Sequence, residues 1–134
     1  YGIVGFAKAL EIATVNHDTE SGYIKSIKLY MAGQLKEYME DVEFNGDYAG
    51  ESLYTVLNVS LPKTEKSEML LFNLDINNIC ASGGSACTSG ADLGSHVIQA
   101  INNNPNKVAV RFSFCRHSTK DEVDVVVEKL KELI

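Results

Sequence analysis

Apolar residues recur every three or four positions through the first forty residues, which is the spacing of helices with one apolar side. This pattern begins at Ile3, and the first helix is expected to end near Val15. The polar stretch 16–19 then predicts a break and a cap for a second helix over 24–38. Lys28 falls outside the apolar stripe of that second helix and is expected to face solvent.

Apolar and polar residues alternate with a period of two further along the chain, which predicts strands. Residues 42–44 and 55–61 fit this pattern, with an Asn-Gly-Asp turn after the first strand and a proline after the second. Residues 76–80 are expected to form a further short extended segment, with Cys80 in the core. Residues 108–114 alternate strictly. These segments predict a small, mainly antiparallel sheet.

Three more helices are indicated by their capping residues. Thr64 is expected to cap one helix and Ser95 a short second one. Thr119 and Glu122 form a capping box that opens the last helix. The first of these helices is predicted to turn four apolar side chains inward, namely Met69, Leu70, Phe72 and Leu74. The fold class predicted is α+β, with the sheet covered on one face by helices.

Composition places the chain among ordinary globular domains. Its 134 residues, 45% hydrophobic and 22% charged, predict a single domain over 1–134. The net charge of −6 opposes binding to nucleic acid or to an anionic membrane. No apolar run reaches the length of a membrane span, and the first residues lack the pattern of a secretory signal. The three scattered cysteines suit a reducing compartment and provide no zinc-ligand spacing, so we expect a cytoplasmic protein without a metal.

Cys87 is the first candidate for chemistry, because every neighbour from Ala81 to Gly90 is Ala, Ser, Thr or Gly. Such a segment lacks large apolar side chains and is typical of a turning or mobile loop. A structural cysteine is usually surrounded by apolar residues, whereas a reactive thiolate needs access. The alternative is a surface turn with an incidental cysteine.

Arg111 is the second candidate. If Val110 and Phe112 face the core, Arg111 lies on the opposite face of the strand among small residues. An anion could approach it there, and its planar fork suits a carboxylate. A solvent-facing arginine on a half-exposed sheet fits the strand pattern equally well.

Two stretches of sequence carry a family resemblance. Ser82-Gly-Gly-Ser-Ala-Cys-Thr-Ser-Gly90 with Ser95-His-Val-Ile, and Val110-Arg-Phe-Ser-Phe-Cys-Arg-His-Ser-Thr119, resemble the C-terminal part of cysteine desulfurases of the NifS/IscS group. The Ser-Ala-Cys-Thr-Ser centre is highly specific, and the resemblance extends over essentially the whole chain. It implies the small domain of a fold-type I pyridoxal phosphate enzyme.

Members of this family use pyridoxal phosphate to convert L-cysteine to L-alanine, leaving a persulfide on the loop cysteine. The resemblance therefore implies that Cys87 is the persulfide-forming nucleophile and that Arg111 anchors the substrate carboxylate. It also implies sulfur transfer to an acceptor or iron–sulfur scaffold protein, and a homodimer in the full-length enzyme.

The sequence departs from the family in two respects. Cys115 stands where the family commonly has glycine, and we expect it to serve packing rather than reactivity. The family attaches its cofactor through a His-Lys pair, but His17, His96 and His117 are followed by Asp, Val and Ser. We therefore expect the chain to be the C-terminal piece of a longer enzyme, to lack cofactor-binding residues, and to be inactive alone.

Two alternatives stay open from the sequence. The chain could be a standalone persulfide-carrying or regulatory binding domain without desulfurase activity. It could also be a structural α+β domain in which Cys87 is inert, in which case its alkylation would be no faster than that of a model thiol.

Overall fold

The computed structural model describes residues 1–84, 95–102 and 104–134. Within them the chain forms an antiparallel three-stranded sheet with strand order β1-β2-β3. The elements along the chain are α1 (Gly2–Tyr38), β1 (Glu43–Phe44), β2 (Val56–Pro62), the 3-10 helix η1 (Glu65–Met69), α2 (Leu70–Ile76), α3 (His96–Ile101), β3 (Lys107–Ser113) and α4 (Lys120–Leu133). The α+β prediction is confirmed.

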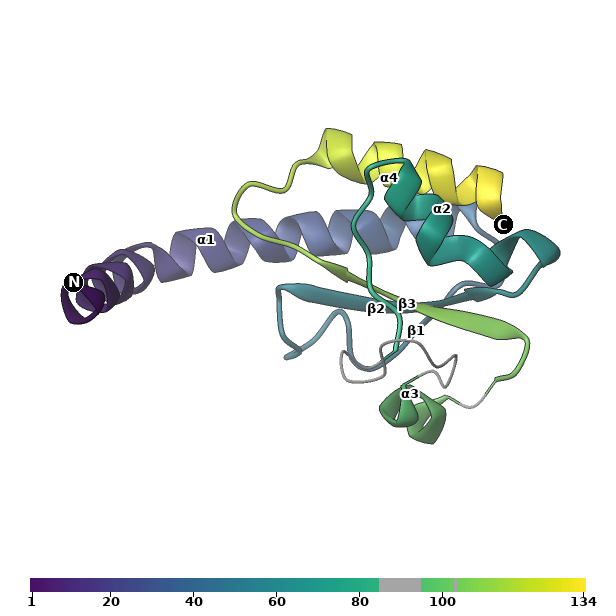
Figure 1. Ribbon diagram of the computed structural model, residues 1–134, viewed down its shortest axis with the longest axis horizontal. Coiled ribbons are helices and arrows are strands. Elements are labelled where there is room, and N and C mark those ends of the chain that lie inside the picture. The colour runs from purple at the N-terminus through teal and green to yellow at the C-terminus, as the bar shows by residue number, and fades with distance from the viewer. Residues whose placement is uncertain (85–94, 103) are drawn as a thin grey trace.

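Helices α1, α2 and α4 lie on one side of the sheet, and α3 lies on the other side (Figure 1). The core fills the space between the sheet and helices α1, α2 and α4. Its fully buried side chains include Ile27, Met31, Leu35, Leu57, Val59, Leu61, Leu70, Leu74, Val110, Val127 and Leu130. On the other face, α3 contributes no buried residue, and the side chains of the strands are mostly polar; we call this the uncovered face.

The break predicted over residues 16–19 is wrong, because α1 continues through it as one helix of 37 residues. The stretch contains neither glycine nor proline, and each of its polar residues costs less than about 0.7 kcal/mol in a helix. Starting a second helix would require another unfavourable nucleation step. His17 accordingly lies exposed on the helix surface rather than at a cap.

The first half of α1 extends beyond the body of the domain (Figure 1). Its apolar side chains at Ile3, Phe6 and Leu10 are exposed. The buried stripe begins only at Ile24. In the part of the chain that the structure describes, no helix combines the length and apolarity needed to cross a membrane.

The extended segment predicted over residues 76–80 is also wrong. Ile76 is the last residue of α2, and Asn78 follows with a φ of 60°, a conformation that asparagine tolerates better than most residues. Ile79 then takes the core position at 8% exposure, so that Cys80 points outward and is exposed rather than buried.

The prediction of which side chains of the helix after Thr64 face inward is half right. Leu70 and Leu74 are buried, whereas Met69 and Phe72 are more than half exposed. Residues four apart share one side of a helix, and the residue midway between them lies on the opposite side. The expected caps at Ser95 and Thr119 are present, because each side chain accepts a hydrogen bond from a backbone N–H three residues later.

Candidate functional site

The uncovered face of the sheet carries a row of polar residues that crosses all of its strands. Asn58 on β2 lies directly opposite Arg111 on β3, and Ser82 pairs with Arg111 on the far side. Asn45, next to β1, donates its backbone N–H to the carbonyl oxygen of Asn58 at 2.9 Å. Asn45, Asn58, Arg111 and Ser82 therefore form one line across the face, which we call the polar row.

Arg111 occupies the position that its alternating sequence predicts. Val110 and Phe112 are buried against the helices, and Arg111 is exposed on the opposite face. None of the described carboxylates lies within 4.0 Å of its guanidinium. Its five N–H donors can therefore bind an external anion.

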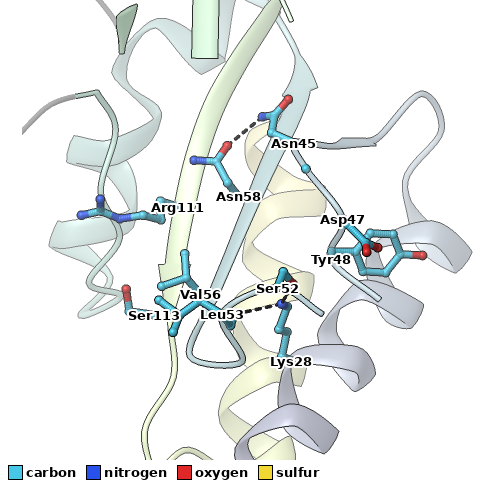
Figure 2. Close-up of a pocket in the computed structure, with 11 residues that line it drawn as sticks. Lys28, Asn45, Asp47, Tyr48, Ser52, Leu53, Val56, Asn58, Arg111 and Ser113 are labelled. Atoms are coloured by element: carbon cyan, nitrogen blue, oxygen red, sulfur yellow. Dashed lines mark hydrogen bonds between the residues drawn. The ribbon is translucent and has the colours of Figure 1, made fainter. Parts of the chain in front are cut away.

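A cavity of about 320 Å³ lies beside the polar row (Figure 2). Strands β2 and β3 contribute Asn58, Arg111 and Ser113 to its lining, and the loop between β1 and β2 contributes Asp47 and Ser52. The lining combines apolar surface, to which Leu53 and Val56 contribute, with the hydrogen-bonding side chains of Asn58 and Arg111 on the sheet, which is the usual make-up of a small-molecule site.

Lys28 lies at one end of this cavity, and the expectation that it faces solvent is wrong. It is 2% exposed, and its Nζ donates to Ser52 Oγ at 2.8 Å and to the Leu53 carbonyl at 3.0 Å (Figure 2). Burial, together with the charge of Lys25, lowers the pKa of Lys28. These two hydrogen bonds connect the loop between β1 and β2 to α1.

The segment that leads to Cys87 begins beside Arg111. Ser82 exchanges two backbone hydrogen bonds with Arg111, at 3.1 and 2.7 Å. Cys87 itself lies outside the described residues.

Gly83 continues the contact between this segment and the domain. A Cβ atom at Gly83 would lie 2.6 Å from Leu71 Cδ1 on α2 and 3.5 Å from the carbonyl oxygen of Ala109 on β3. The absence of a side chain lets the backbone pass closely between β3 and α2.

A network of hydrogen bonds on the same face joins α3 to the sheet. Lys107, whose side chain is 4% exposed, pairs with Glu43 at 2.7 Å and with Asp41 at 3.0 Å. Asn102, the residue that ends α3, donates to Glu43 at 2.7 Å. These two bonds to Glu43, that from Lys107 first, lower the pKa of its carboxyl group. Burial lowers the pKa of Lys107, but its hydrogen bonds to Glu43 and Asp41 outweigh that effect and raise it.

Cys115 is exposed, so the packing role expected for it is wrong. The backbone N–H of His117 lies 3.4 Å from its sulfur, and the Ser118 hydroxyl lies 3.9 Å from it. These donors, that of His117 first, lower the pKa of the thiol. Cys115 is therefore the natural control for experiments on Cys87.

The described residues provide no free lysine for attaching an aldehyde cofactor at the polar row. The two lysines on or beside this face are Lys28 and Lys107, and both ammonium groups are already hydrogen bonded. The residues present therefore do not form a complete pyridoxal phosphate site. Among the same residues, no group of three His, Cys, Asp or Glu side chains could hold a metal ion.

Sequence reasoning found Arg111 but missed the amides beside it. The alternation of residues 55–61 gives Asn58 no role of its own, and Asn45 enters only as part of the Asn-Gly-Asp turn. Their shared row depends on strand register, which the alternating pattern of each strand does not reveal. A useful signal was available in Asn58, a polar side chain in the middle of an otherwise apolar strand.

Comparison with known proteins assigns the chain to a family. The sequence model of the class-V aminotransferase family matches residues 1–126, so the chain belongs to that family. A cysteine desulfurase of Nostoc sp. is 33% identical over 99% of this chain and 33% of its own length. A cysteine desulfurase IscS of Dictyoglomus turgidum is 31% identical over 99% of this chain and 34% of its own length.

A solved NifS-like protein of Rickettsia africae has the same fold, with a TM-score of 0.76 at 23% identity over 98% of this chain and 33% of its own. The chain spans about a third of the length of the curated relatives that it matches. The chain is therefore a class-V aminotransferase domain, and the two relatives that it resembles in sequence are cysteine desulfurases.

Proposed function

We propose that this chain serves as the C-terminal, small domain of a cysteine desulfurase, in which Arg111 binds the carboxylate of L-cysteine and Cys87 accepts the sulfur. The observation that carries the proposal is the pairing of Ser82 with Arg111. This pairing begins the Cys87 segment beside an exposed arginine that has no carboxylate partner among the described residues. Sequence similarity to cysteine desulfurases, which extends over nearly the whole chain, supports the same assignment.

The proposed reaction balances without an external oxidant. The bond between Cβ and sulfur of the substrate breaks, and a bond forms between that sulfur and Cys87 Sγ. The substrate carbon gains a hydrogen and becomes the methyl group of L-alanine, while Cys87 becomes a persulfide. Both sulfur atoms are oxidised by the equivalent of one electron, and the carbon is reduced by two.

The cofactor proposed for this reaction is pyridoxal phosphate, held outside the described residues. The hydrogen bonds of Lys28 and Lys107 support this proposal, because neither ammonium group is free to attach the cofactor. The part of this chain in the reaction is then to bind the substrate carboxylate and to present a thiolate, which is the nucleophilic form of cysteine.

The proposed partners are L-cysteine, a sulfur-acceptor or iron–sulfur scaffold protein, and a second copy of the full-length enzyme. A persulfide must meet its acceptor at the protein surface, and the uncovered sheet face offers such a surface. We propose a cytoplasmic location, since the exposed thiols of Cys80 and Cys115 persist best in a reducing compartment.

Substitution of Cys87 in the full-length protein tests the proposal. With L-[35S]cysteine as substrate and no reductant, the wild type should retain protein-bound label that a thiol releases. Cys87→Ala should lose this label, and Cys115→Ala should keep it. If Cys87→Ala still transfers sulfur to an acceptor, the assignment of Cys87 is wrong.

Inactivity of the chain alone is a separate claim. The purified 134-residue chain, given L-cysteine and pyridoxal phosphate, should release no sulfide above a protein-free control. Release that depends on Cys87 would contradict the claim. Acceptance of sulfur from a separate donor protein, without desulfurase activity of the full-length protein, would favour the alternative of a sulfur-carrying domain.

A further inference from the structure

Asn58 and Arg111 lie directly opposite each other on β2 and β3, and each uses its backbone groups for hydrogen bonds to a different neighbour. The backbone N–H and carbonyl of Arg111 point toward Ser82, and the carbonyl of Asn58 points toward Asn45. The two residues therefore form a pair without hydrogen bonds between their own backbones. In such pairs the Cα atoms are about 4.5 Å apart and the side chains approach more closely than in hydrogen-bonded pairs.

The carboxylate of Glu43 fixes the orientation of a chain of amides. A carboxylate paired with Lys107 can only accept, so the atom of Asn102 that lies 2.7 Å from it must be the amide nitrogen. The same nitrogen lies 3.3 Å from Asn45. Asn45 must therefore accept there with its Oδ1, and its Nδ2 is turned toward Asn58.

Asn45 Nδ2 donates to Asn58 Oδ1 at 2.7 Å and to Ser60 Oγ at 2.8 Å. The carbonyl oxygen of the Asn58 amide is thereby held, and its nitrogen is directed away from Asn45. Figure 2 shows this nitrogen on the side of β2 that faces β3, where Arg111 lies. No acceptor for it is present among the described residues.

We propose that Asn58 Nδ2 is a second donor to the carboxylate of the amino-acid substrate, beside the guanidinium of Arg111. The proposal rests on the proposed function of Arg111 and deepens it. Arg111 binds both carboxylate oxygens with its fork, and Asn58 adds a hydrogen bond to one of them. Asn58 is then a substrate-binding residue, whereas Asn45 and Asn102 are positioning residues that keep a donor, rather than an acceptor, facing the ligand.

The chemistry explains why the orientation matters. A carboxylate accepts hydrogen bonds only, so an Asn58 amide turned by 180° would present its oxygen and repel the ligand. Because Glu43 can only accept, the amides of Asn102 and Asn45 keep their present orientations. The Asn45 amide nitrogen then faces Asn58, so the turned orientation of Asn58 is excluded. The uncovered face therefore selects an anionic group instead of a neutral or cationic one.

The test uses the full-length protein and two ligands that differ only in the carboxylate. The dissociation constants of radiolabelled L-alanine and of ethylamine are measured by equilibrium dialysis, and KM and kcat are measured with L-cysteine. The variants are Asn58→Asp, which replaces the donor by an acceptor, and Asn45→Asp, which removes the donor that orients Asn58. Asn77→Asp, which changes an exposed amide at the end of α2 on the opposite side of the sheet, is the matched control.

We expect both Asn variants to weaken L-alanine binding by about tenfold or more, the usual effect of losing a hydrogen bond to a charged group. Ethylamine binding should stay within about twofold of the wild type, since a merely structural effect would weaken both ligands. KM for L-cysteine should rise in parallel while kcat at saturation is largely kept. Asn77→Asp should resemble the wild type.

The outcomes separate this inference from the proposed function. If Arg111→Ala weakens L-alanine binding but Asn58→Asp and Asn45→Asp do not, the role of Asn58 is overturned and that of Arg111 stands. Equal loss of L-alanine and ethylamine binding in the Asn variants also overturns the inference. If Arg111→Ala has no effect on L-alanine binding, the proposed function of Arg111 is itself wrong.

Discussion

Ser82 and Arg111 exchange both of their backbone hydrogen bonds, with N···O distances of 3.1 and 2.7 Å. This one pair attaches the segment that leads to Cys87 to the strand that carries the candidate carboxylate anchor. The two candidates identified in the sequence, 24 positions apart, are connected through it. Both hydrogen bonds of this pair lie within the described residues.

Arg111→Lys in the full-length protein should raise KM for L-cysteine by about tenfold or more. Lysine keeps the charge but presents a point ammonium instead of a planar fork, so the two-point contact with a carboxylate is lost. Steady-state kinetics with L-cysteine measure the effect. Arg116→Lys is the control, because Arg116 pairs with Glu20 at the surface. Unchanged KM in Arg111→Lys would argue against a bidentate contact.

Gly83→Ala should destabilise the domain by about 0.5–1.5 kcal/mol, the cost of forcing Leu71 off its preferred rotamer. The added Cβ would otherwise lie 2.6 Å from Leu71 Cδ1. Urea unfolding of the single variants and of the double variant Gly83→Ala/Leu71→Ala forms a double-mutant cycle. The cost of Gly83→Ala should disappear in the Leu71→Ala background. A cost that persists there would locate the strain elsewhere.

Glu43→Gln should make stability less sensitive to acid. The hydrogen bonds from Lys107 and Asn102 hold the pKa of Glu43 below its ordinary value of 4.5, so folding favours its charged form. Its contribution is present above pH 4.5 and is lost as the pH falls through the lowered pKa. Thermal unfolding from about pH 3 to about pH 7 should show a shallower decline in Glu43→Gln than in the exposed control Glu40→Gln. Equal slopes in the two variants would contradict the coupling.

Leu130→Ala should destabilise the domain by about 2–5 kcal/mol, because it leaves a cavity in the core beneath α4. Leu130 is fully buried, whereas Val125 on the same helix is 59% exposed. Val125→Ala should change the free energy of unfolding by less than about 0.5 kcal/mol. Chemical denaturation of both variants measures the difference. A small loss in Leu130→Ala would mean that α4 packs loosely on the core.

The sequence was most informative where one residue type decides the local structure. The strict alternation of residues 108–114 fixed which side chains of β3 face the helices, and so placed Arg111 on the uncovered face. Thr119 and Glu122 fixed the start of α4, because their side chains and backbone satisfy each other. Local periodicity and capping need no knowledge of distant residues.

Sequence patterns failed at residues 16–19 and at Lys28, for two different reasons. Residues 16–19 resemble a cap, yet the continuing helix makes them part of α1. Lys28 resembles a surface lysine, yet Ser52 and Leu53 accept hydrogen bonds from its ammonium under the loop between β1 and β2. The partners that decide the position of Lys28 lie outside its local window, whereas residues 16–19 stay helical because none of them stops a helix that has already begun.

The sequence by itself determined the α+β class, the faces of β2 and β3, the capped start of α4 and the family to which the chain is similar. Only the tertiary structure decided that Asn45, Asn58, Arg111 and Ser82 share one row. The physical reason is that alternation fixes the face of each strand separately, whereas the register between strands depends on hydrogen bonds and packing across the sheet. The same register places Arg111 between Asn58 and Ser82 in the polar row.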